Sequence, residues 1–324
     1  MYKLNNIELI NYGIHAGRAS NSNIALSGFL DMPSRLGKTH HDWSDELGTE
    51  PYVLAEEIRH GGRDITFYGL MEGADQADAI NRVQELYLDM HKFTDLVPLQ
   101  TPWGTFNVYV KDTVEGKYIG QGWATLQIVF REPIVTMDAT IPTGTSIGLY
   151  NIDNVGYSDL GAIVTNVKDN FNRPATKSAH FTAYATEGYQ VTKMGPIKIV
   201  QTLYFVAPDY EALKGNVQKF QQLLAGPGLR VINVDNMERE CFNAEGFTVE
   251  DIRIMDGQCV CKLTVPLIMV GAGVPVEPAY LLDNYGEAIL ANIDFIKVDK
   301  YALDFITDND GNRLITNKFE DITL

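Results

Sequence analysis

The residue types that could carry out chemistry are few and scattered in this sequence. Of the six histidines, only His40 and His41 are adjacent. Neighbours in an extended segment point in opposite directions, so we interpret this pair as part of a solvated loop rather than a metal or acid–base site. Cys259 and Cys261 would share one face of a strand, but no second ligand pair lies at a spacing suited to zinc. We therefore expect small, buried thiols.

Two further patterns could indicate an enzyme. Residues 144–148 match GxSxG, but a nucleophile elbow needs a strand before the serine and a helix after it, and this match lies in a Thr- and Gly-rich segment. Residues 42–46, with the sequence DWSDE, place carboxylates beside an indole ring that could face a sugar. Such groups arise by chance in a chain with 42 acidic residues. No P-loop or dinucleotide-binding motif occurs. We expect no catalytic residues, no cofactor and no metal.

The composition excludes several classes of protein. The chain has 324 residues, of which 45% are hydrophobic, so it can bury a substantial core. Its net charge of −16 argues against a general nucleic-acid binder and against a basic membrane-surface module. No apolar run approaches the roughly 20 residues that span a bilayer, and the N-terminus lacks the apolar region of a secretory signal. With three cysteines, the sequence predicts a soluble protein of a reducing compartment.

The chain contains a loose internal repeat. Amphipathic helices are expected at 74–93 and 209–224, and aligning Val83 with Val217 sets an offset of 134 positions (217 − 83). The apolar stripe of the first helix, which we expect to pack on its own sheet, is Ile80, Val83, Tyr87 and Met90. The stripe of the second is Tyr210, Leu213, Val217, Phe220 and Leu224. An apolar run before each helix and a strand ending at proline after it follow in the same order, which indicates tandem duplication.

Strands are expected outside the two helices, with alternating patterns at 106–110, 126–130 and 248–254. Because strands greatly outnumber helices, we predict a mainly β fold of two tandem antiparallel β-sandwich or barrel domains, each with one flanking α-helix. The predicted domains are 1–135 and 153–270, with a linker at 136–152 and a β-hairpin extension at 271–324. Two unrelated topologies, or a single core continuous through both halves, would contradict the duplication.

The segments GFLDMPSRLGKT (28–39), DWSD (42–45) and GRDIT (62–66) resemble distal tail and tail-tube-like proteins of tailed bacteriophages and prophages. Those proteins share a β-sandwich with one flanking helix and a long loop, and they assemble into rings. The resemblance covers residues 1–135 best, with residues 173–177 as the counterpart of the loop at 33–38. Typical distal tail proteins carry a galectin-like second domain. Here the second half looks like a copy of the first, which is closer to hub proteins with two tube-like domains per chain.

The resemblance implies a structural component of a phage or prophage tail tip or baseplate, which forms a ring around the DNA conduit. Such a protein would be assembled in the bacterial host cytoplasm and would end in the virion tail. The ring would hold six chains, or three chains with two equivalent domains each. A long loop from about Arg35 to Pro51 would reach a neighbouring subunit, with Arg35, Lys38, Asp42 and Trp43 as contact residues.

Further partners under this reading are neighbouring tail proteins and passing DNA, without sequence-specific contact and without a membrane. An acidic lumen would repel phosphates, although the charge could equally serve solubility. An alternative function stays open, namely a carbohydrate-binding β-sandwich module for host attachment. That function would need an exposed aromatic platform, for which Trp43 and Trp103 are the candidates.

Overall fold

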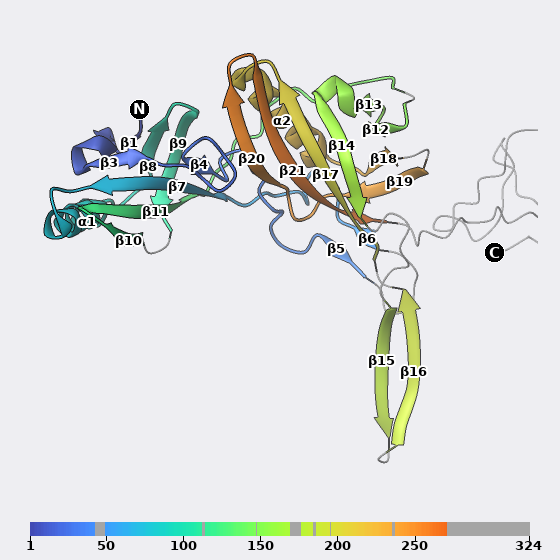
Figure 1. Ribbon diagram of the computed structural model, residues 1–324. Helices are drawn as coiled ribbons and strands as arrows, with labels where there is room; N and C mark the ends of the chain where they lie inside the picture. Colours follow the sequence, from blue (N-terminus) through green and yellow to red (C-terminus); the bar gives the residue numbers. More distant parts are fainter. Residues whose placement is uncertain are drawn as a thin grey trace, which may run out of the picture. The chain divides into compact units, whose positions relative to one another are not determined.

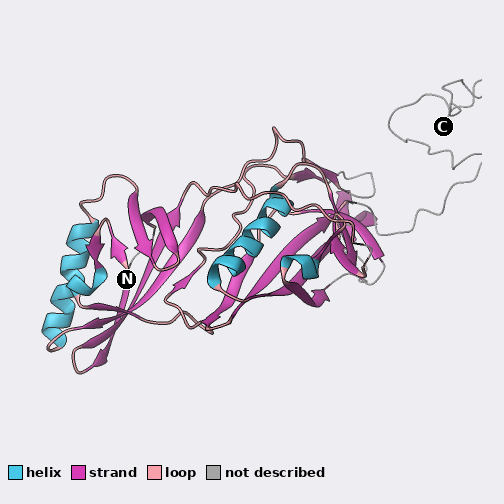
Figure 2. Cartoon of the chain, turned by 90° about the horizontal axis from the view of Figure 1, so that it is seen from above, coloured by secondary structure: helices cyan, strands magenta, loops and turns pink. Residues whose placement is uncertain are grey.

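The computed structural model describes the backbone and side chains of residues 1–42, 49–111, 114–146, 148–168, 196–234 and 237–270, and the backbone of 176–183 and 186–194. The predicted β-hairpin extension at 271–324 lies outside the described residues. The fold is mainly β, with antiparallel sheets and one α-helix in each half of the described chain, as the sequence predicts (Figures 1 and 2).

The first half, residues 1–135, contains one sheet in the order β2-β1-β8-β9-β11-β7-β3, with β10 paired to β11 and β4 paired to β7. Its strands are β1 (Lys3–Leu4), β2 (Ile7–Glu8), β3 (Ile14–Ala16), β4 (Leu26–Ser27), β7 (Arg63–Glu72), β8 (Val97–Thr101), β9 (Gly104–Val110), β10 (Glu115–Gly120) and β11 (Trp123–Glu132). The long pair β7 and β11 forms the centre, with Phe67 opposite Ile128. Both side chains are buried, because alternate residues of each strand face the core.

The second half, residues 150–270, contains a sheet in the order β13-β12-β18-β19-β21-β17-β14, with β20 paired to β21. Its strands are β12 (Tyr150–Ile152), β13 (Val155–Gly156), β14 (Ala162–Lys168), β17 (Lys198–Ala207), β18 (Arg230–Val234), β19 (Met237–Phe242), β20 (Thr248–Met255) and β21 (Gln258–Met269). This order matches that of the first sheet strand for strand, with β4 as the one strand of the first sheet that lacks a counterpart. Strand β12 begins inside the segment predicted as the linker, 136–152, and the predicted domain boundaries stay predictions.

Local details repeat as well. The turns between β1 and β2 and between β12 and β13 hold Asn5-Asn6 and Asp153-Asn154 at positive φ, the backbone of a tight two-residue hairpin. A short 3₁₀ helix follows each, Leu9–Tyr12 and Tyr157–Leu160, and ends at a glycine in the left-handed region. These features lie 148 positions apart (161 − 13). The two halves therefore share one topology, and descent by duplication remains our inference from that likeness.

The helices are α1 (Gln76–Met90) and α2 (Tyr210–Ala225). Asp75 and Asp209 cap them, each accepting a hydrogen bond from the backbone N–H three residues on. The five residues predicted for the stripe of α2 are all buried, as expected. Figure 2 shows each helix lying along strands of its own half.

The stripe predicted for α1 needs one correction. Ile80 is 45% exposed, and the small residue before it, Ala79, faces the sheet instead. Ala79 lies so close to Gly73 that a Cβ on this glycine would be 2.4 Å from the Ala79 nitrogen. A search for large apolar residues overlooks such a contact between small residues. Val83 and Met90 do pack on the core, as predicted.

Each half carries an insertion at the same place in its topology. The first insertion, residues 17–62, lies between β3 and β7 and contains a small hairpin of β5 (His40–His41) and β6 (Glu50–Pro51). The second insertion, residues 169–197, lies between β14 and β17 and contains the hairpin of β15 (Thr176–Ala183) and β16 (Thr186–Met194). These insertions explain why the offset between the halves falls from 148 before them to 134 after them.

The two sheets are separate in their hydrogen bonds, but their buried side chains form one contiguous cluster. The described residues all belong to one compact unit. By the criterion stated above, this continuous core counts against the duplication, whereas the common strand order supports one module used twice. The structure shows both, so the two modules are fused into a single packed body.

Candidate functional site

The four predicted contact residues lie in or beside the first insertion, and the structure describes three of them. Arg35 is buried, its backbone N–H donates to the Ala244 carbonyl at 2.8 Å, and its guanidinium donates to the Tyr52 carbonyl. Burial lowers the pKa of Arg35. Lys38 is exposed, with its Nζ 2.6 Å from His41 Nδ1 and 5.6 Å from the centre of the Tyr52 ring.

Asp42 is half-buried next to β5, and Trp43 lies outside the described residues. The structure therefore brings Arg35 and Lys38 together on Tyr52 and does not place the indole of Trp43. That these four residues contact a neighbouring subunit stays a prediction.

Both ends of the predicted loop pack on the second half of the same chain. The Thr49 N–H donates to the Val270 carbonyl at 3.1 Å, and the Gly228 N–H donates to the Val53 carbonyl at 2.8 Å. The His40 ring lies 5.7 Å from the ring of Phe242 on β19. A small apolar cluster completes this contact: Phe242, Ala244 and Ile268 with Val53, Leu229 and Val270. The sequence did not indicate this intramolecular contact.

The start of the first insertion closes the outer edge of β20. The Asn23 amide accepts from the Ile254 N–H at 2.9 Å and donates to the Ile254 carbonyl at 2.7 Å. The Asn23 N–H donates to the Ile252 carbonyl, and the Ile252 N–H donates to Ser22 Oγ, both at 3.1 Å. Ser22 and Asn23 thus replace a neighbouring strand and satisfy the outer backbone groups of Ile252 and Ile254.

Further along this edge, Asp31 Oδ1 accepts from the Val249 N–H at 2.7 Å, and Met32 pairs with Phe247 through both backbone hydrogen bonds. The backbones come so close that a Cβ on Gly246, at φ +72°, would be 2.0 Å from the Met32 oxygen. Burial raises the pKa of Asp31 to about 6, and the Val249 N–H and the charge of Arg63 oppose that shift. A carboxyl whose pKa is raised by burial therefore lies where the two halves meet.

Aromatic residues form a second join between the halves. The ring of Trp103, in the turn between β8 and β9, lies edge-on to Tyr210 at 5.0 Å, and the Tyr210 hydroxyl donates to the Trp103 carbonyl at 2.7 Å. The indole N–H donates to the Tyr2 hydroxyl at 3.3 Å. Trp103 is thus half-buried with its ring against protein, which does not favour its use as a flat sugar-binding platform.

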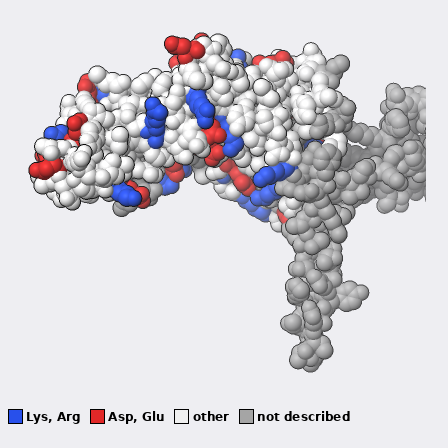
Figure 3. All heavy atoms as spheres, viewed as in Figure 1, with Lys and Arg blue, Asp and Glu red and all other residues white. Residues whose placement is uncertain are grey.

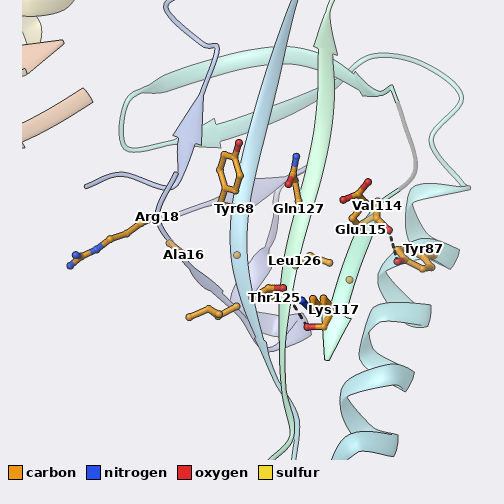
Figure 4. A pocket seen from close by; sticks show the side chains of 14 residues that line it. Ala16, Arg18, Tyr68, Tyr87, Val114, Glu115, Lys117, Thr125, Leu126 and Gln127 are labelled. Carbon is orange, nitrogen blue, oxygen red and sulfur yellow. Dashed lines mark hydrogen bonds between the residues drawn. The ribbon is translucent and has the colours of Figure 1, made fainter. Parts of the chain in front are cut away.

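A depression of about 980 Å³ lies in the first half. It runs over backbone and side chains of residues 16–18, 68–70, 114–117 and 125–127, and Tyr87 of α1 lines its margin. The Tyr87 hydroxyl donates to the Val114 carbonyl at 2.9 Å, which ties α1 to the start of β10. Figure 4 shows Arg18 on the opposite side of the depression from Glu115 and Lys117, which both come from β10. Its surface is mostly strand and strand edge.

The other candidate groups lie in ordinary structural surroundings. Cys259 and Cys261 are buried, as predicted, and burial raises the pKa of Cys261 to about 12. Ser146 Oγ accepts from the Gly148 N–H at 3.3 Å, inside the segment that precedes β12. Within the described residues, no three His, Cys, Asp or Glu side chains are grouped to hold a metal ion. In the same part of the chain, neither helix has the length and apolar character that crossing a membrane requires.

No family model and no curated protein sequence matches this chain. Among solved structures, the chain is similar to the Dit protein of phage SPP1, described as a paradigm of the hub adsorption apparatus in phages that infect Gram-positive bacteria. The TM-score is 0.31 and the sequence identity is 13%, over 83% of this chain and 97% of the Dit chain. A TM-score this low does not establish a common fold.

Proposed function

We propose that this chain is a structural component of a phage or prophage tail tip or baseplate, and that it forms a ring around the DNA conduit. One observation carries the proposal: the same β module occurs twice in the chain, and the insertion of the first module closes a sheet edge of the second. Contact between like modules through an inserted arm is the kind of contact that builds a ring. The sequence resemblance of residues 28–66 supports the same setting.

A ring of six modules follows from three chains or from six, depending on whether one or both modules of each chain line it. Neighbouring tail proteins would bind its two faces, and DNA would pass without sequence-specific contact. The net charge of −16 suits such a conduit, because like charges prevent adhesion. On the face shown in Figure 3, acidic and basic side chains are interspersed, so an acidic lumen would be lined by other surfaces.

The self-association of the full chain tests this function. Analytical ultracentrifugation from micromolar to submillimolar concentrations should show a closed trimer or hexamer, and electron microscopy of the same sample should show rings with a central opening. A strictly monomeric mass across this range would contradict the proposal. The rings should not bind duplex DNA even at low salt, whereas salt-sensitive binding would contradict a passive conduit.

A further inference from the structure

Within the described residues, the same sheet edge is closed in the second half and unpaired in the first half. The outer edge of β20 is closed by Ser22, Asn23 and Asp31 of the first insertion. The equivalent strand, β10, pairs with β11, and in the described part of the chain no segment pairs with its other edge. The side chains of β10 are exposed except at its last residue, and Ile119 is 57% exposed. An edge of this kind can add a strand from another chain.

Helices α1 and α2 also differ in how far other parts of the chain cover them. Contacts from the first half cover α2: the Gln221 amide donates to the Asp31 carbonyl at 3.4 Å, and Tyr210 packs on Trp103. In the first half, α1 leaves Ile80 and Leu88 exposed, Leu88 at 63%; at the offset of 134 their counterparts on α2 are Lys214 and Gln222. The Tyr87–Val114 hydrogen bond places α1 beside the start of β10, so the helix and the open edge are neighbours.

The hairpins of the two insertions also differ in their contacts. The hairpin of the first insertion, β5 and β6, packs on the second half through His40 and Thr49. The hairpin of the second insertion, β15 and β16, pairs only with itself among the described residues. Within the described chain, the first insertion contacts the second half and closes the outer edge of β20. The hairpin β15–β16 and the outer edge of β10 have no such contact there.

We propose that the outer edge of β10 and the exposed face of α1 dock the second half of another copy of this chain, with the hairpin β15–β16 as the arm. Inside one copy the first insertion makes the corresponding contact through Ser22, Asn23 and Asp31 at the β20 edge, while its hairpin lies beside β19. Such a head-to-tail contact gives a ring when its rotation closes, in which each chain supplies two successive modules. The inference rests on the proposed function for ring closure, and it identifies the surface through which two copies bind.

A double substitution on the exposed surface tests the interface. In I119K/L88K two exposed apolar side chains become charged, so folding is unaffected, but the docked surface would bury two lysines. We expect the concentration for half-maximal association to rise at least about tenfold in sedimentation velocity. The control is Ile134→Lys, an apolar residue that is 76% exposed and lies outside both docking surfaces, and it should associate like the wild type.

A mixing experiment tests the head-to-tail direction. Chains in which residues 176–194 are replaced by a short Gly-Ser turn keep the β10 edge and lose the arm, whereas I119K/L88K chains keep the arm and lose the edge. Each variant alone should remain monomeric, and an equimolar mixture should give a one-to-one heterodimer and nothing larger. The heterodimer would support the inference, because only one intact interface remains.

Failure of the docking surface and failure of the ring function give different results. If the wild type forms rings and both variants form them equally well, the docking surface is wrong and the ring function survives. If the variants dissociate but their mixture forms no heterodimer, the arm is not the partner of the β10 edge, and the inference is overturned. If the wild type itself is monomeric at all concentrations, both the interface and the proposed function fail.

Discussion

Helix α2 buries seven of its side chains, whereas α1, at the same place in the other half, buries two. The strand order around both helices is the same, so topology does not explain the difference. The first insertion and the turn holding Trp103 lie against the second half, and they convert an amphipathic helix and an open strand edge into interior. The burial of α2 and the closure of the β20 edge therefore depend on contacts from the first half, and not on the topology of the second half alone.

The largest expected effect is the difference in the free energy of unfolding between a substitution in α2 and one in α1. Phe220→Ala removes a fully buried ring from α2 and should lower the free energy of unfolding by about 3–5 kcal/mol. Leu88→Ala in α1 should change it by less than about 0.5 kcal/mol, because the side chain is largely exposed. Urea denaturation of both variants measures the difference. Equal losses would mean that α1 is covered in the monomer, contrary to the comparison.

The join itself should depend on pH through Asp31. Its pKa is raised to about 6 in the folded chain, so its contribution to stability is present below its unfolded pKa and is lost as pH rises through 6. Relative to Asp31→Asn, which keeps the oxygen that accepts from Val249, the wild type should lose at most about 3 kcal/mol between pH 4 and pH 7. Denaturation across this range measures the difference, and parallel curves would show that Asp31 is solvated.

A smaller effect is expected at the closed edge of β20. Asn23→Ala removes two hydrogen bonds to Ile254, and it should cost about 1–2 kcal/mol and speed hydrogen exchange at the Ile254 amide. The control Asn107→Ala changes an exposed residue of β9 and should stay within about 0.5 kcal/mol. Unchanged exchange at Ile254 in the first variant would mean that the insertion does not close this edge.

The smallest effect concerns Lys38. Its contacts with His41 and Tyr52 are solvent-exposed, so Lys38→Ala should lower the free energy of unfolding by about 0.5 kcal/mol or less. Ring assembly would weaken if Lys38 also contacts a neighbouring subunit, as the sequence predicts. A loss of several kcal/mol would instead make Lys38 part of the join between the halves.

The sequence predicted those parts of the fold that periodicity determines. The long strands, both helices and the order of elements around them follow from alternating and helical patterns at an offset of 134. A second offset was also available: Asn5-Asn6 and Gly13 recur as Asp153-Asn154 and Gly161, but an alignment on the helices alone passes over them.

The contacts between the halves could not be predicted in the same way. Asn23 and Asp31 are single polar residues in a loop, and no local pattern marks a side chain that caps a strand more than 200 positions away. The exposure of Ile80 was missed for a related reason, because the buried neighbour is Ala79, a small residue packed beside Gly73. Such facts depend on tertiary packing rather than on spacing.

Hydrogen–deuterium exchange of the wild-type chain, below and above its assembly concentration, tests the equivalence of the two edges most directly. In the monomer the amides of 248–255 should include protected outer-edge groups, whereas the outer-edge amides of 115–120 should exchange rapidly. On assembly the amides of 115–120 should become as protected as those of 248–255, which should not change. Rapid exchange at 115–120 in the assembled ring would contradict the account.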